Sequence, residues 1–317
     1  MEWEETRLSE KKEDKPKSRR GDKPSSQATG QGTLWPTQPP SDEKLSTDAS
    51  QDIGDATSAD TKSRPSKRAG VGREKTVIQD LLFPEGLLAA KLSLDAPTLD
   101  DLQEKLEANL RQNSSETRQR YAQSVLKWFF PDGLDGLARR VWTAYHDDRI
   151  ESDILGYLYL SSEPIMAACV AEALFPLQEG IVIPPGYFDR FLKDYLGAQP
   201  PPKTLERVKM NLVKLGFLKP ARGAGHRLNP MTPTKTAFLV LLHHLFAPVQ
   251  PRTIELRHLF ANPFWKYLGF KSEDTVRGVI REANASGLLG KYVVADELEQ
   301  ITSCLSLADI LNRGVRL

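Results

Sequence analysis

The sequence TLERVKMNLVKLGFL at residues 204–218 decides the fold, because a second copy, TVRGVIREANASGLL, occupies residues 275–289. The two copies begin 71 residues apart and are identical at four of fifteen positions. Upstream of each copy, Tyr-Leu-Gly occurs at residues 195–197 and again at 267–269. Internal similarity at a fixed spacing indicates that one structural unit is used twice.

Each copy has the pattern of a helix that ends at a glycine, Gly216 or Gly287, and passes into a strand. Glycine commonly takes the left-handed conformation that closes a helix. This order predicts the third helix of a winged helix-turn-helix and the start of its wing, with Tyr-Leu-Gly closing the second helix. In the first copy, 217–218 and 226–228 are expected to form the wing hairpin around the Gly-Ala-Gly turn at 223–225.

The second copy gives a weaker signal for a wing. Lys291–Val294 has the composition of a strand, and the position of its returning strand stays open. Helix and wing together still predict a mainly α chain with tandem winged-helix-like units.

The first helix carries an apolar stripe at Leu205, Val208, Leu212 and Leu215, and we expect polar residues on the opposite, exposed face. Residues 203–281 hold 14 basic and only 4 acidic side chains, which suits the phosphate backbone of DNA. Arginine and asparagine can also read base edges in the major groove. The expected DNA-contacting residues are Lys203, Arg207, Lys209, Asn211 and Lys214 on the helix and Lys219, Arg222 and Arg227 in the wing, with a weaker contribution from Arg277 and Arg281, which Glu273, Asp274 and Glu282 offset.

Four regions are expected along the 317 residues: a disordered polar leader (1–75), an acidic helical lobe (76–180), a winged-helix-like unit with the basic helix (181–230), and a second such unit (231–317). Charge supports this division, since residues 76–197 hold 11 basic and 19 acidic side chains and residues 198–317 hold 17 and 9. The leader is rich in Ser, Asp, Lys, Gly and Pro, and its few apolar residues have no period. Such a segment cannot bury enough surface to offset its ordering entropy.

The acidic lobe is predicted to be helical because Leu99, Leu102, Leu106 and Leu110 recur at steps of three and four residues. Thr98 stands where a helix cap is expected. The carboxylates of this lobe are interpreted as scattered over polar helix faces.

Nothing in the sequence favours an enzyme. His243 and His244 are adjacent and diverge on a helix, so they cannot share a metal ion. Cys169 and Cys304 form no zinc-binding cluster, and no Gly-rich phosphate loop or nucleophile elbow occurs. No apolar run approaches the roughly 18–20 residues that span a bilayer, and the polar N-terminus shows no secretory signal. We therefore expect a cytoplasmic, non-catalytic protein without cofactor or metal.

The string EANLRQNSSETRQRYAQSVLKWF at residues 107–129, followed by GYFDRFLKDYL at 186–196, resembles the BrxA family of bacteriophage-exclusion (BREX) defence systems. The resemblance covers residues 100–245. It implies a cytoplasmic, non-catalytic protein that binds double-stranded DNA and acts beside other defence proteins, such as an adenine methyltransferase and an ATPase. It also implies that DNA contacts fall on the basic helix, here Arg207, Lys209, Asn211 and Lys214.

Two other interpretations stay open. Winged helices also dock proteins, so the chain could be a scaffold without affinity for DNA. Within DNA binding, a plasmid or phage replication or transcription factor has the same kind of architecture.

Overall fold

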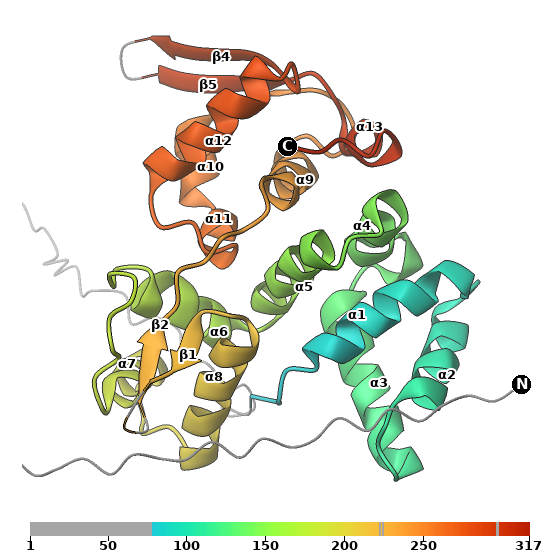
Figure 1. Cartoon of the computed structure of the whole chain (residues 1–317), viewed down its shortest axis with the longest axis vertical. Helices are drawn as coiled ribbons and strands as arrows, with labels where there is room; N and C mark the ends of the chain where they lie inside the picture. The colour runs from blue at the N-terminus through green and yellow to red at the C-terminus, as the bar shows by residue number, and fades with distance from the viewer. Residues whose placement is uncertain (1–77, 222, 224, 296–297) are drawn as a thin grey trace, which may run out of the picture. The chain divides into compact units, whose positions relative to one another are not determined.

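A computed structural model describes residues 78–221, 223, 225–295 and 298–317 of the chain. The described residues all belong to one compact unit of the chain. This unit is mainly helical, as the sequence predicts (Figure 1). The leader predicted at residues 1–75 lies outside the described residues.

The first lobe begins with a short extended segment, Ile78–Leu82, and continues as helices joined by short turns. Its elements are α1 (Phe83–Leu92), α2 (Leu99–Asn109), α3 (Ser115–Phe129), α4 (Leu137–Tyr145), α5 (Asp148–Ser162), α6 (Pro164–Ala168) and a π-helix (Cys169–Leu174) that continues α6, with 3-10 turns at Ser93–Asp95 and Gly133–Asp135. Thr98 caps α2 in a reciprocal pair with Asp101, as its residue type predicts. Of the expected leucine stripe, Leu102, Leu106 and Leu110 are buried, whereas Leu99 is exposed.

The first repeat consists of α7 (Tyr187–Leu196), α8 (Pro202–Lys214) and the antiparallel hairpin β1 (Leu218–Pro220) and β2 (His226–Leu228). The hairpin has the strands that the sequence predicts. A preceding extended segment adds to it, since Val182 bridges Arg227 and the Leu228 amide donates to the Ile181 carbonyl. The short strand ahead of α7 therefore pairs with the returning strand of the hairpin.

The second repeat has the same order of elements. It consists of α9 (Lys235–Phe246), β3 (Thr253–Glu255), α10 (Leu256–Ala261), α11 (Phe264–Tyr267), α12 (Glu273–Ala285), β4 (Leu289–Ala295) and β5 (Leu298–Ser303), and α13 (Leu307–Asn312) follows it. The sheet order is β3-β5-β4, so the leading strand again pairs with the returning strand. The returning strand that the sequence left open is Leu298–Ser303. In both copies, therefore, a helix that ends at glycine leads into an antiparallel hairpin, and the returning strand pairs with a segment from ahead of that helix.

The two glycines that close the repeated helices have the predicted conformation. Gly216 has a φ of 84° and Gly287 a φ of 71°. In each case the following amide, of Phe217 or Leu288, donates to the carbonyl five residues earlier, as in a Schellman motif. The prediction that a left-handed glycine closes the repeated helix is confirmed in both copies.

A pair of alanine substitutions, one just after α12 and one inside it, tests this cap. A Cβ at Gly287 would meet no atom within 4 Å, so Gly287→Ala should cost only backbone strain, about 1–2 kcal/mol of unfolding free energy. Gly278, inside the same helix, also has open space around it, and Gly278→Ala should stabilise by about 0.5–1 kcal/mol. Urea denaturation of both variants measures the two shifts. Shifts of the same sign would contradict the left-handed cap.

Candidate nucleic-acid interface

Helix α8 carries five of the ten residues that the sequence assigns to DNA contact. It begins at Pro202, and its apolar stripe faces the core as predicted: Val208 and Leu212 are fully buried and Leu215 nearly so. The contacts of its polar face decide whether the predicted residues can reach DNA.

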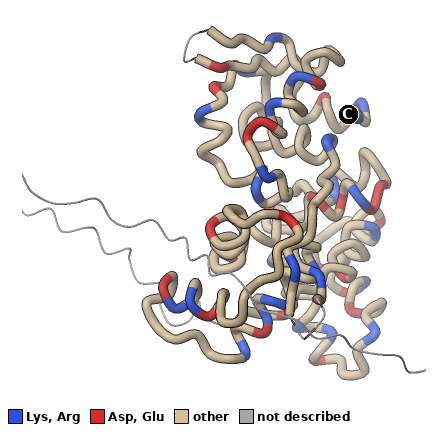
Figure 2. Tube along the Cα trace, turned by 60° about the vertical axis from the view of Figure 1, so that its left-hand side comes forward, with Lys and Arg blue, Asp and Glu red and all other residues tan. Residues whose placement is uncertain are grey.

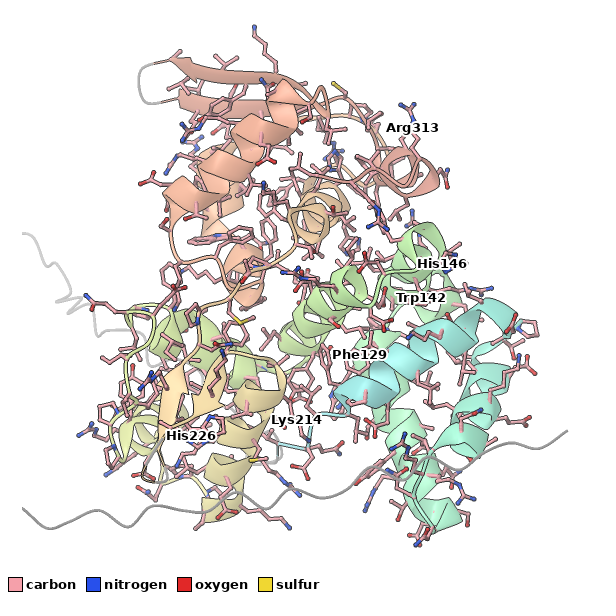
Figure 3. All side chains as sticks on the ribbon, viewed as in Figure 1. Phe129, Trp142, His146, Lys214, His226 and Arg313 are labelled. Carbon is pink, nitrogen blue, oxygen red and sulfur yellow. The ribbon has the colours of Figure 1, made fainter. Side chains whose placement is uncertain are left out.

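The polar face of α8 packs against the extended segment Ile78–Leu82. Arg207 donates through Nη1 to the Ile78 carbonyl at 2.7 Å, and its Nε lies 3.8 Å from Asp80. Lys214 donates through Nζ to the Leu81 carbonyl at 2.9 Å. Figure 3 shows Lys214 on the side of α8 that faces the chain entering α1. Both cations are therefore engaged within the protein.

Asn211 lies at the centre of the same contact and is fully buried. Its Oδ1 accepts from the Leu81 amide at 2.9 Å, and its Nδ2 donates to the Gln79 carbonyl and the Tyr159 hydroxyl, each at 2.8 Å. The expectation that Asn211 stands on an exposed face and reads bases is wrong. The physical reason is that an extended segment leaves its peptide groups without ladder partners, and the side chains of α8 supply them.

The other cations of the first repeat are not engaged in this way. Lys203, Lys219 and Arg227 are exposed and Lys209 is half-buried, and none forms an ion pair with any described residue. Lys219 and Arg227 are directly opposite each other in the hairpin. Burial, and then the charge of Lys209 on α8, lower the pKa of His226 on β2, which Figure 3 labels. Arg222 lies outside the described residues.

We call Lys209, Lys219 and Arg227 the basic hairpin cluster. Basic and acidic residues are interspersed over the described chain (Figure 2). Local composition therefore does not distinguish this cluster, whereas its lack of ion pairs with described residues does. Among the described residues, the predicted site residues of the first repeat thus form two sets. One set contacts the segment before α1: Arg207, Asn211 and Lys214. The other set forms no ion pair with a described residue: Lys203, Lys209, Lys219 and Arg227.

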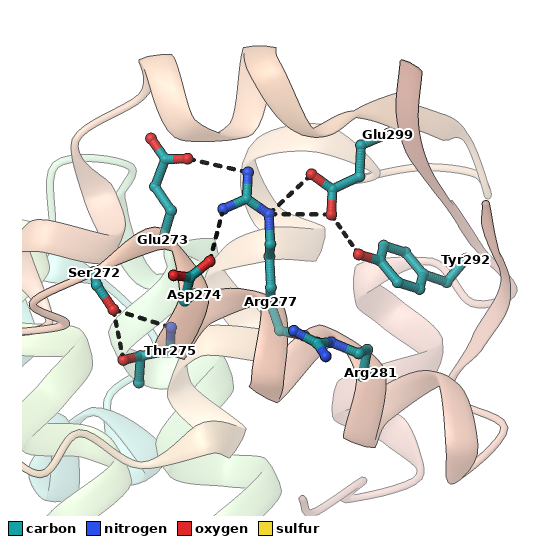
Figure 4. A network of polar contacts seen from close by, with 8 residues as sticks. All are labelled: Ser272, Glu273, Asp274, Thr275, Arg277, Arg281, Tyr292 and Glu299. Atoms are coloured by element: carbon teal, nitrogen blue, oxygen red, sulfur yellow. Dashed lines mark hydrogen bonds and ion pairs between the residues drawn. The ribbon is translucent and has the colours of Figure 1, made fainter. Parts of the chain in front are cut away.

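The second repeat holds Arg277 in a network of carboxylates (Figure 4). Its guanidinium lies 3.1 Å from Glu273, 3.3 Å from Asp274 and 2.9 Å from Glu299. Tyr292 on β4 donates its hydroxyl to Glu299. Arg281 is exposed and donates to the Arg277 carbonyl at 3.3 Å. The predicted offset by Glu273 and Asp274 is confirmed, whereas Glu282 pairs with Lys235 at 2.6 Å instead.

The second hairpin also differs from the first in its exposed residues. Val294 is 64% exposed and Leu298 44% exposed. Sequence reasoning missed Glu299 and Tyr292, because their roles depend on the returning strand β5, which the sequence did not locate. Residues 298–303 hold only two apolar side chains, three positions apart, so they give little signal for a strand.

The described residues hold no candidate metal cluster. No group of three or more His, Cys, Asp or Glu side chains there could hold a metal ion. His243 is buried with Nδ1 at 2.8 Å from the Leu239 carbonyl, a partner within its own helix. No single described helix is long and apolar enough to cross a membrane, and only the bent pair Asp148–Ser162 and Pro164–Leu174 passes by length and composition.

No family model, curated protein or solved structure matches this chain.

Proposed function

We propose that this protein binds double-stranded DNA without catalysis, through tandem winged-helix units, as a cytoplasmic accessory component of a BREX-type anti-phage system. The observation that carries the proposal is the basic hairpin cluster, which has no carboxylate partner among the described residues. In such a system a methyltransferase and an ATPase would be its protein partners.

The order of elements in both repeats supports the winged-helix assignment. Each has a helix, a short strand, further helices and a hairpin, with the leading strand paired to the returning one. In DNA-binding winged helices the hairpin can track the phosphate backbone beside the helix that enters the groove. Lys219 and Arg227 stand on that hairpin, and Lys209 lies next to it on α8.

The contacts between α8 and the segment before α1 limit which side chains can contact DNA. Because Arg207, Asn211 and Lys214 hold the segment Ile78–Leu82, they are not available to read base edges. Contacts by lysine and arginine to phosphates carry no sequence information themselves. We therefore expect the binding to have little sequence preference and a strong dependence on salt.

Charge reversal in the cluster tests this function. If three cations meet phosphates, the logarithm of affinity should fall with log salt at a slope of about −2.7, so a fourfold rise in salt weakens binding roughly 40-fold. Lys219→Glu combined with Arg227→Glu should weaken binding to two unrelated duplexes alike, by at least roughly tenfold at low salt. Fluorescence anisotropy at several salt concentrations measures both effects.

The matched control is Arg111→Glu with Lys127→Glu, which makes the same change in net charge at exposed side chains of the first lobe. This variant should keep most of the wild-type affinity. Wild-type protein that binds neither duplex at low salt would contradict the proposal.

One observation favours a second function, a protein-docking scaffold. In the second repeat, carboxylates neutralise Arg277, while the apolar Val294 and Leu298 face solvent on the hairpin. That surface suits a protein better than phosphates. A protein that shows no affinity for DNA but loses partner capture with Val294→Asp would favour the scaffold.

A further inference from the structure

A cavity of about 650 Å³ lies between α4 and the turn that follows α13. Three arginines line it: Arg139 and Arg140 from α4, and Arg313 from the turn. Figure 3 labels Arg313 above α4, and Figure 1 shows the two elements next to each other. These arginines are about 170 residues apart in sequence and meet only in the folded protein.

None of the three arginines forms an ion pair with a described residue. Asp135 is the one carboxylate in the cavity wall among the described residues. Two further carboxylates lie nearby without an ion pair to them: Asp132, which acts with Arg140 on the pKa of His244, and Asp309, whose pKa Arg313 helps to lower. Three like charges around one concavity repel one another, and a bound anion would relieve that repulsion.

Hydrogen bonds fix the walls of the cavity. The Tyr145 hydroxyl donates to the Val315 carbonyl at 2.9 Å, and Arg316 binds both the Tyr145 carbonyl at 3.1 Å and Asp147 at 3.0 Å. The Leu317 amide donates to the Thr236 hydroxyl at 3.1 Å. The residues after Arg313 are thereby held against the end of α4. Because this backbone is already held in place, a ligand that binds here orders few additional residues, which lowers the entropic cost of binding.

We propose that this cavity binds a small phosphate-bearing molecule of the nucleotide class. Guanidinium groups pair with phosphate oxygens through two parallel hydrogen bonds, which suits arginine to phosphate recognition. The volume lies within the range of small-molecule sites. Leu134 and Leu311 offer apolar wall for a ring, and Asn312 and Asp135 can hydrogen-bond to its polar edge. The backbone of a DNA duplex is a convex rod, which fits a concavity of this size less well than a free nucleotide does.

Isothermal titration calorimetry of the full chain with three probes tests the site. ADP and inorganic pyrophosphate are each expected to bind at one per chain, and adenosine, which lacks phosphate, should not bind detectably. Arg139→Gln and Arg313→Gln should each weaken ADP binding at least roughly tenfold, since each removes one charge-assisted phosphate contact. Arg111→Gln, at an exposed arginine in the first lobe, is the matched control and should bind ADP as the wild type does.

Several outcomes would overturn the site. Wild-type protein that binds neither ADP nor pyrophosphate would do so, as would equal affinity of the wild type and both folded variants. Duplex DNA that binds through Arg139 and Arg313, while ADP does not, would assign these arginines to a DNA surface instead. Thermal melting checks that each variant folds. If Arg139→Gln does not fold, Arg313→Gln still tests the site, because the Arg313 side chain is exposed. The inference does not rest on the basic hairpin cluster, so failure of DNA binding leaves it standing.

Discussion

The Asn211→Leu variant is expected to lose about 3 kcal/mol or more of unfolding free energy. Leucine is close to asparagine in size and makes no hydrogen bond. The change would leave the Leu81 amide, the Gln79 carbonyl and the Tyr159 hydroxyl without their partner. A buried polar group left unsatisfied costs about 1–3 kcal/mol. Urea denaturation followed by circular dichroism measures the loss as a shift of the midpoint at unchanged slope.

The neighbouring residue provides the control. Met210 stands next to Asn211 on α8 and is 51% exposed. Met210→Ala should change the unfolding free energy by no more than about 0.5 kcal/mol, as is usual for a surface position. If Asn211→Leu also stayed within about 1 kcal/mol of the wild type, the segment Ile78–Leu82 would not be held by α8 as described.

The second large effect concerns Glu151, which is fully buried in α5 and whose two carboxylate oxygens have no hydrogen-bond partner among the described residues. Burial above all, and the charge of Asp148 next, raise its pKa well above the usual range. Glu151 is therefore an exception to the expectation that carboxylates of the first lobe lie on polar helix faces. The folded protein holds this carboxyl protonated at pH values where the unfolded chain ionises it.

This difference in protonation between the folded and unfolded states determines how stability changes with pH. Below the unfolded pKa of about 4.3 both states bind the proton and Glu151 adds no pH dependence. As the pH rises above that value, the folded state retains a proton that the unfolded state has lost. Stability then falls by about 1.4 kcal/mol per pH unit until the folded pKa is reached.

Glu151→Gln removes this titration, so the variant should become steadily more stable than the wild type as the pH rises from 4 to 7. We expect the difference to widen by up to about 1.4 kcal/mol per pH unit over this range. Urea denaturation at pH 4, 5, 6 and 7 measures it. Glu104→Gln, at an exposed side chain of α2, serves as control and should show no such trend. A difference for Glu151→Gln that stays constant with pH would contradict the buried, protonated state.

Local sequence signals were sufficient for the helices and their ends. The four-residue steps of Leu102, Leu106 and Leu110 place one face inward wherever the helix packs, and Thr98 caps that helix through a neighbour three residues away. Gly216 and Gly287 close their helices through contacts within five residues. Such features depend on backbone geometry over one or two turns, so the sequence alone determines them.

The repeat was also visible in the sequence, because both copies keep the same apolar positions and the same closing glycine. The pairing of its strands was only partly visible. The first hairpin was predicted from the Gly-Ala-Gly sequence between two short segments, whereas β5 follows two acidic residues in the sequence and lacks apolar alternation. Strand pairing depends on the partner across the sheet as much as on the strand itself.

Only the tertiary structure decided which cations are free. Arg207, Asn211 and Lys214 have the spacing of an exposed polar face, and the segment that covers them lies about 130 residues earlier in the chain. Arg277 likewise meets Glu299 on a strand that folds back over its helix, and Arg313 meets Arg139 from the far end of the sequence. Helical periodicity tells which side chains share a face. It carries no information on what packs against that face, because the packing partner comes from distant chain that only folding brings into contact.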